Sequence, residues 1–139
     1  MTLLVDTSGL LVLLDRAASA HEVCVAAATA EPRLVVSPFI LAEADYLVTR
    51  RVGAAVALQL LRDVADGAYE LASFAAVDMA AAVAVLERYD DLGVGLADAS
   101  LVVLADRYDT GRVLTFDERH FRALRWRSRR HFRLAPVDP

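Results

Sequence analysis

Four carboxylate side chains stand within or directly after apolar stretches of this 139-residue chain. Asp6 and Asp117 each follow a short apolar run that is typical of a buried strand, and Glu43 and Asp98 fall on the apolar faces of two predicted helices. A buried negative charge is costly unless a positive group offsets it. The chain must therefore fold so that these acids meet a positive partner, and one divalent cation would serve them all.

The two strand-end acids are predicted from local pattern. Asp6 ends the run Leu3-Leu4-Val5 and precedes Thr7-Ser8-Gly9, where the chain turns into a helix. Asp117 follows the predicted strand 113–115. Taken singly, each aspartate could be a turn residue at the end of a strand.

The two helix acids interrupt apolar faces. In the predicted helix 38–51, Ile40, Glu43 and Leu47 recur at i, i+3 and i+7, which predicts that Glu43 faces inward. Its own helix offers arginine only a full turn or more away. Asp98 lies in the first turn of a strongly apolar helix, where it could instead serve only as a cap or a partner for the helix dipole.

Strands and helices alternate along the sequence. The patterns predict strands at 3–6, 34–36, 69–71, 113–115 and near 132–135, and helices at 8–16, 21–30, 38–51, 54–65 and 77–89, with a further helix carrying Asp98. This order predicts one α/β domain over residues 1–139, with a mostly parallel sheet covered by helices on both faces. Such sheets collect functional groups at the carboxyl ends of their strands, which is where the acids fall.

Residue types exclude several classes of protein. The single Cys24 excludes an internal disulfide, and His21, His120 and His131 lack zinc-binding spacing, which suits a reducing cytosol. The chain has no lysine, and a P-loop requires one. No apolar stretch is long enough to cross a bilayer, so we expect a cytoplasmic protein without membrane contact.

Positive charge gathers at the C-terminal end. Residues 119–139, called here the basic segment, contain 7 arginines and one acid, whereas residues 1–118 contain 8 arginines and 18 acids. Guanidinium groups match phosphate oxygens, and interleaved aromatic rings can stack on unpaired bases. The candidate RNA contacts are Arg119, His120, Arg122, Arg125 and Arg127. The alternative is a solvated surface that offsets the acidic body.

Four stretches resemble the PIN-domain ribonucleases, and specifically the VapC toxins of bacterial VapBC toxin–antitoxin pairs. They span nearly the full length in the family's order: Leu4-Val5-Asp6-Thr7-Ser8-Gly9-Leu10, Val36-Ser37-Pro38 through Ala42-Glu43 to Tyr46-Leu47, Leu96-Ala97-Asp98-Ala99-Ser100, and Thr115-Phe116-Asp117-Glu118-Arg119-His120-Phe121. The resemblance implies a PIN-like three-layer α/β/α sandwich around a mostly parallel sheet of about five strands. It also implies a homodimer and a cognate VapB-type antitoxin.

The resemblance implies a metal-dependent endoribonuclease whose catalytic and metal-binding acids are Asp6, Glu43, Asp98 and Asp117. It further implies cleavage of a structured RNA, in a tRNA or ribosomal RNA loop, leaving a 5′-phosphate and a 3′-hydroxyl. Carboxylate oxygens suit Mg²⁺, with Mn²⁺ as a possible substitute, and Mg²⁺ commonly uses only one or two direct carboxylates. We expect Asp6 and Asp98 nearest the ion, and Glu43 and Asp117 acting through water.

Neighbouring hydroxyls form a second group of candidates. Thr7, Ser8 and Thr115 flank the acids and could orient water, although capping accounts for Ser8 and strand propensity for Thr115 equally well.

Two other functions compete with the nuclease. One is a non-catalytic RNA-binding or regulatory module that keeps the fold, whose mark would be a missing acid. The other is a phosphohydrolase of small esters with Asp6 as nucleophile, which usually requires a second acid two residues on, where this chain has Ser8.

Overall fold

The computed structural model describes all 139 residues and has a five-stranded parallel sheet at its centre. Its strands are β1 (Thr2–Val5), β2 (Arg33–Val36), β3 (Glu70–Leu71), β4 (Arg112–Leu114) and β7 (Arg133–Ala135). They lie in the order β3-β2-β1-β4-β7, with every neighbouring pair parallel. The predicted α/β class with a mostly parallel sheet is confirmed.

The central strands are buried on both faces. In β1, Leu3, Leu4 and Val5 are all fully buried, and Leu4 pairs with Val35 of β2 on one side and Val113 of β4 on the other. A continuous apolar run, rather than an alternating one, is what a parallel sheet with helices on both faces requires.

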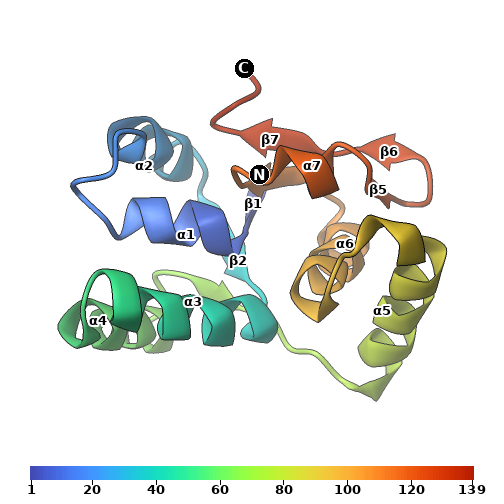
Figure 1. The fold of residues 1–139 in the computed structure, drawn as a ribbon, viewed down its shortest axis with the longest axis horizontal. Coiled ribbons are helices and arrows are strands. Elements are labelled where there is room, and N and C mark those ends of the chain that lie inside the picture. The colour runs from blue at the N-terminus through green and yellow to red at the C-terminus, as the bar shows by residue number, and fades with distance from the viewer.

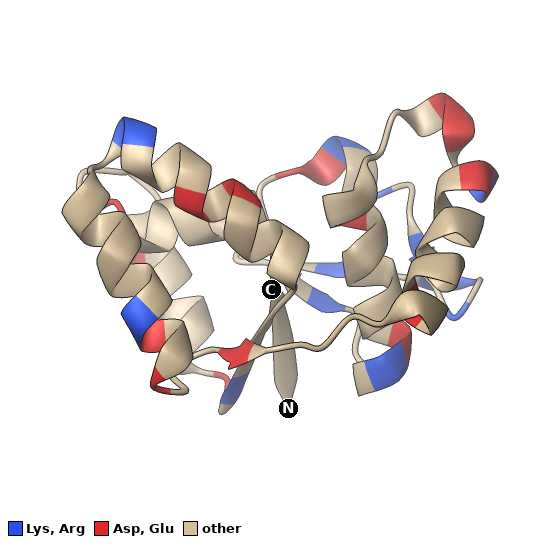
Figure 2. Cartoon of the chain, turned by 90° about the horizontal axis from the view of Figure 1, so that it is seen from below, with Lys and Arg blue, Asp and Glu red and all other residues tan.

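Six helices cover the sheet in two groups, completing three layers (Figure 1). On one side lie α1 (Thr7–Leu13), α2 (His21–Thr29), α3 (Pro38–Arg51) and α4 (Ala54–Ala65), and on the other lie α5 (Ala76–Arg88) and α6 (Leu96–Tyr108), preceded by a 3-10 turn at Asp90–Leu92. Figure 2 shows the same two groups on either side of the strands from below. None of these helices combines the length and the apolar character needed to cross a lipid bilayer.

Helix α1 packs unusually close to β4. A Cβ atom placed on Gly9 would lie 2.8 Å from Cγ of Leu114 and would also collide with the Leu114 carbonyl oxygen. Any side chain at this position would push α1 away from the strand. Gly9 therefore lets α1 begin directly after β1 while the ends of β1 and β4, and the acids that follow them, stay close together.

The basic segment contains elements that sequence patterns did not predict. It contains all of α7 (Glu118–Phe121) except the first residue, and an antiparallel hairpin of β5 (Arg125–Trp126) and β6 (Arg130–His131) before β7. Each hairpin strand has only two residues, and the turn places Arg127 and Ser128 at φ 46° and 65° without a glycine. Neither the length nor the turn residues give the usual hairpin signal.

Candidate active site

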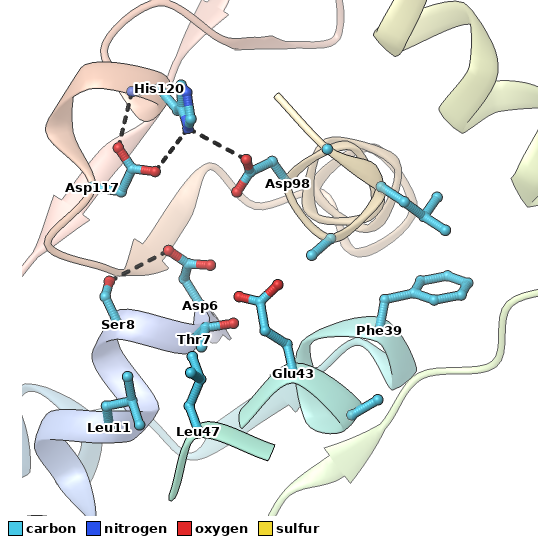
Figure 3. A pocket seen from close by; sticks show the side chains of 14 residues that line it. Asp6, Thr7, Ser8, Leu11, Phe39, Glu43, Leu47, Asp98, Asp117 and His120 are labelled. Atoms are coloured by element: carbon cyan, nitrogen blue, oxygen red, sulfur yellow. Dashed lines mark hydrogen bonds and ion pairs between the residues drawn. The ribbon is translucent and has the colours of Figure 1, made fainter. Parts of the chain in front are cut away.

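The four predicted carboxylates line one open pocket of about 620 Å³. Figure 3 shows the side chains of Asp6, Glu43, Asp98 and Asp117 pointing toward a common space. They come from the end of β1, from α3, from the first turn of α6 and from the start of α7. Neither arginine nor lysine lines this acid pocket, so the negative charges have no basic partner other than His120.

Asp6 is the most deeply buried of the four. The residue is 5 % exposed, and its Oδ2 atom accepts a hydrogen bond of 2.7 Å from the Thr115 hydroxyl. Burial raises the pKa of Asp6 from 3.8 to about 6; the nearby charges of Asp98 and Asp117 add to the increase, and the Thr115 hydrogen bond opposes it. The protein thus holds this carboxylate where its charge is unfavourable in the absence of a cation.

Two predicted hydroxyls connect the ends of β1 and β4. Thr115 Oγ1 accepts from the Asp117 backbone N–H at 3.0 Å while donating to Asp6, so a single hydroxyl contacts two of the acids. Ser8 Oγ accepts from the Phe116 N–H at 2.9 Å and lies 3.4 Å from Asp6 Oδ2. These bonds fix the position of Asp6 relative to the start of α7.

The third predicted hydroxyl, on Thr7, also faces the acid pocket. Its Oγ1 atom is buried and has no hydrogen-bond partner in the protein. An orphaned buried hydroxyl costs free energy, and a ligand or a water carried by one would satisfy it.

Asp98 is positioned by the packing of α6 against α3. Ser100, two residues on, is fully buried and shares a 2.7 Å hydrogen bond with Ser37, which caps α3. This contact holds the first turn of α6 next to the helix that carries Glu43. Burial raises the pKa of Asp98; the Asp117 and Glu43 charges raise it further, whereas His120 lowers it.

Asp117 and His120 form a local pair at the start of α7. Asp117 caps this helix by accepting from the His120 backbone N–H at 3.1 Å. Nδ1 of His120 lies 2.8 Å from Asp117 Oδ2 and 3.3 Å from Asp98 Oδ2. The sequence grouped His120 with the RNA-contacting residues, but the structure places its ring inside the acid pocket. In the sequence, His120 comes three residues after Asp117, which places the two side chains on the same face of a helix, and this spacing was the signal that could have predicted the pair.

Glu43 is exposed, so the expectation that it faces inward is wrong. The buried positions of α3 are Ile40, Ala44 and Val48, one residue further round the helix from Glu43. Glu43 lies on the adjoining stripe with Phe39 and Leu47, and this stripe forms a wall of the pocket. The apolar neighbours that suggested a core position line an open cavity, where a carboxylate stays hydrated.

Most of the candidate RNA-contacting arginines form contacts within the protein. Arg122 donates to Asp138 at 2.7 and 2.8 Å and to Glu118 at 3.1 Å, which raises its pKa. Arg125 donates to three backbone carbonyls, and Arg127 pairs with Asp109 at 3.1 Å. Arg119 is exposed and forms no ion pair, which leaves its guanidinium available.

The donor set fits a divalent cation. Single ligand atoms of Asp98, Asp117 and His120 lie within 4.8 Å of one another, and Asp6 and Glu43 add carboxylates to the same pocket. Crowded carboxylates repel one another, and a cation relieves that repulsion. The buried Asp6 and the orphaned Thr7 hydroxyl are the features of this site that a cation with bound water would explain.

Sequence comparison finds known relatives over most of the chain. The family profile described as "PIN domain" matches residues 3–126. Ribonuclease VapC26 of Mycobacterium tuberculosis is 46 % identical over 124 residues, which cover 88 % of this chain and 92 % of that protein.

Two solved structures share the fold. The crystal structure of VapC20 of Mycobacterium tuberculosis, described as a sarcin-ricin loop cleaving toxin, superposes with a TM-score of 0.76 at 20 % identity, over 84 % of this chain and 90 % of that one. VapBC2 of Rickettsia felis, bound to a promoter DNA fragment, superposes with a TM-score of 0.63 at 16 % identity, over 87 % and 91 %. The match to the PIN-domain profile and the 46 % identity to VapC26 show that the chain belongs to the PIN-domain family, among the VapC ribonucleases of VapBC toxin–antitoxin pairs.

Proposed function

We propose that this protein is a Mg²⁺-dependent endoribonuclease that acts as the toxin of a type II toxin–antitoxin pair. The observation that carries the proposal is the acid pocket, in which four carboxylates converge without an arginine to neutralise them. The similarity to a ribonuclease over most of the chain supports the same reaction. The preserved acids argue against a non-catalytic module.

Asp6 and Asp98 are the carboxylates we assign nearest the metal, with Glu43 and Asp117 orienting water. When bound, Mg²⁺ or Mn²⁺ lowers the pKa of a water molecule and offsets charge on the scissile phosphate. Thr115 keeps Asp6 in place by its 2.7 Å hydrogen bond, and Asp117 is fixed as the cap of α7. Glu43 is exposed and lines the acid pocket, so it would contact water that enters with the substrate.

The proposed substrate is a loop of structured RNA, in a tRNA or ribosomal RNA, whose cleavage would inhibit translation. Arg119, one residue before the pocket histidine and free of internal ion pairs, is the arginine best placed to contact a phosphate next to the cleaved bond. The description of VapC20 as a sarcin-ricin loop cleaving toxin makes ribosomal RNA a first substrate to test.

The proposed partners are a VapB-type antitoxin and a second copy of the chain. Exposed apolar side chains on α4 include Leu58 and Leu61, and a second pocket of about 660 Å³ lies between this helix and the segment 13–17 at the end of α1. The structurally similar VapBC2, whose name joins a VapB with a VapC chain, supports such a partner. A positively charged antitoxin side chain could pair with the carboxylates of the acid pocket, because no arginine of this chain occupies it.

Cleavage of a structured RNA by the purified chain tests the proposed reaction. Asp98→Asn should lower the rate by at least about 100-fold in Mg²⁺, because it removes one metal-facing charge and leaves the shape unchanged. EDTA should abolish cleavage by the wild type. Glu70→Gln is the matched control, since Glu70 is on the edge strand β3, does not line the acid pocket, and should leave the rate unchanged.

Three outcomes would contradict the proposal. Undiminished cleavage by Asp98→Asn would remove the acid pocket from the reaction. RNA binding without metal-dependent cleavage would favour a binding module. Release of phosphate from a small ester at a rate above that of RNA cleavage would favour the phosphohydrolase.

A further inference from the structure

His120 lies between two carboxylates that belong to different elements. Its Nδ1 atom is 2.8 Å from Asp117 Oδ2 and 3.3 Å from Asp98 Oδ2, and Figure 3 shows the ring reaching toward both. One ring nitrogen therefore lies within the negative potential of both carboxylates, one on α6 and one at the start of α7. A cation that binds between these two Oδ2 atoms would either bind to this nitrogen or displace the ring.

Displacement of the ring is disfavoured by the way α7 is anchored. The next residue, Phe121, is 1 % exposed and packs edge-on against Phe132 with ring centroids 5.4 Å apart. The backbone N–H of His120 is itself held by Asp117 at 3.1 Å. The backbone of His120 is thus fixed on both sides, and its side chain is only 19 % exposed.

We propose that Nδ1 of His120 is a direct ligand of the metal ion that Asp98 binds, and that Asp117 contacts the same ion through water. This inference rests on the metal dependence of the proposed function and adds a nitrogen to what would otherwise be an all-oxygen site. Mg²⁺ prefers oxygen ligands, whereas imidazole suits transition ions. The site should therefore bind Mn²⁺ more tightly than Mg²⁺, and His120 should cause that preference.

Metal binding to the full chain separates the two roles that His120 could have. Asparagine at position 120 can still donate a hydrogen bond to a carboxylate but offers no ring nitrogen. His120→Asn should weaken Mn²⁺ binding by about 10- to 100-fold while changing Mg²⁺ binding by less than about 3-fold. The control is His131→Asn, because His131 is exposed in the β5–β6 hairpin, outside the acid pocket, and its loss should change neither affinity.

Pulsed electron paramagnetic resonance of bound Mn²⁺ gives a direct readout that does not depend on RNA cleavage. The wild type and His131→Asn should show coupling to one imidazole nitrogen, and His120→Asn should show none, with circular dichroism used to check that each variant is folded. Bound Mn²⁺ without nitrogen coupling in the wild type, or coupling that survives in His120→Asn, overturns the proposal. Such a result with RNA cleavage intact would leave the nuclease function standing, whereas an absence of any metal binding would overturn both.

Discussion

The two ends of the same parallel sheet treat acidic residues in opposite ways. At the amino ends of the strands, Glu31 pairs with Arg112, and Glu70 accepts two hydrogen bonds from Arg33 at 2.8 and 2.9 Å. At the carboxyl ends, Asp6 and the other pocket acids have no arginine partner. The chain has 15 arginines, so the difference reflects placement rather than supply.

The pKa values follow the same division. The pKa of Glu70 is lowered by the hydrogen bond from Tyr108 and by Arg33, although burial opposes this. The pKa of Asp6 is raised to about 6, mainly by burial. The acids at the amino ends of the strands pair with arginines of the same chain and stabilise the fold. The acids at the carboxyl ends have no arginine partner and can bind a cation. The structure thus separates acids that stabilise the fold from acids that are available for function.

The largest expected effect comes from making the carboxyl end resemble the amino end. Glu43→Arg places a guanidinium at the edge of the acid pocket, where it can pair with the carboxylates and compete with a metal ion. RNA cleavage in Mg²⁺ should fall by at least about 100-fold. The matched control is Asp45→Arg, which makes the same charge change on α3 outside the pocket. Equal loss in both variants would show a general charge effect and not a local one.

The converse change removes the positive partner of an acid at the amino ends of the strands. Glu31 has a side chain only 4 % exposed, so Arg112→Met leaves a buried carboxylate without its partner. We expect a loss of about 2–4 kcal/mol in the free energy of unfolding, measured by urea denaturation. Adding Glu31→Gln should restore much of it. A loss that persists in the double variant would mean that packing of Arg112, and not its charge, supplies the stability.

The third prediction concerns the stability cost of Asp6 without metal. Because the folded pKa of about 6 exceeds the ordinary value of 3.8, the folded state holds the proton of Asp6 more tightly, so the contribution of Asp6 to stability is greatest below pH 4 and falls as the pH rises to 6. In EDTA at pH 7, Asp6→Asn should therefore be more stable than the wild type, with a free energy of unfolding about 2–3 kcal/mol higher. Its stability should also fall less between pH 4 and pH 6. A difference in stability between Asp6→Asn and the wild type that does not grow between pH 4 and pH 6 would contradict the assigned direction.

The smallest effect concerns the arginines outside the pocket. Arg119→Gln should reduce the slope of log affinity for RNA against log salt concentration by about one unit, measured with an inactive Asp98→Asn background. Arg122→Gln is the comparison, because Arg122 is already paired with Asp138 and Glu118 and should change the slope less. Equal slopes in the two variants would place the phosphate contact elsewhere.

Local pattern was enough to predict several parts of the fold and site. Asp6 and Asp117 were recognised because each follows an apolar run, and the runs became β1 and β4. Glu43 was found for a partly wrong reason: periodicity placed it inward, but its neighbours Phe39 and Leu47 line a cavity, and sequence alone does not distinguish a core from a pocket wall. His120 joined the site only through the packing of α6 beside α7.

The sequence by itself determined the alternation of strands and helices and the identity of the acids, because burial and helix periodicity are properties of short segments. Only the tertiary structure decided which charges are compensated. Arg33 meets Glu70 across two strands, and Asp98 meets His120 across two helices, at separations of 37 and 22 positions in the chain. The energy of a charge depends on what lies within a few ångströms of it, and that is known only once the chain has folded.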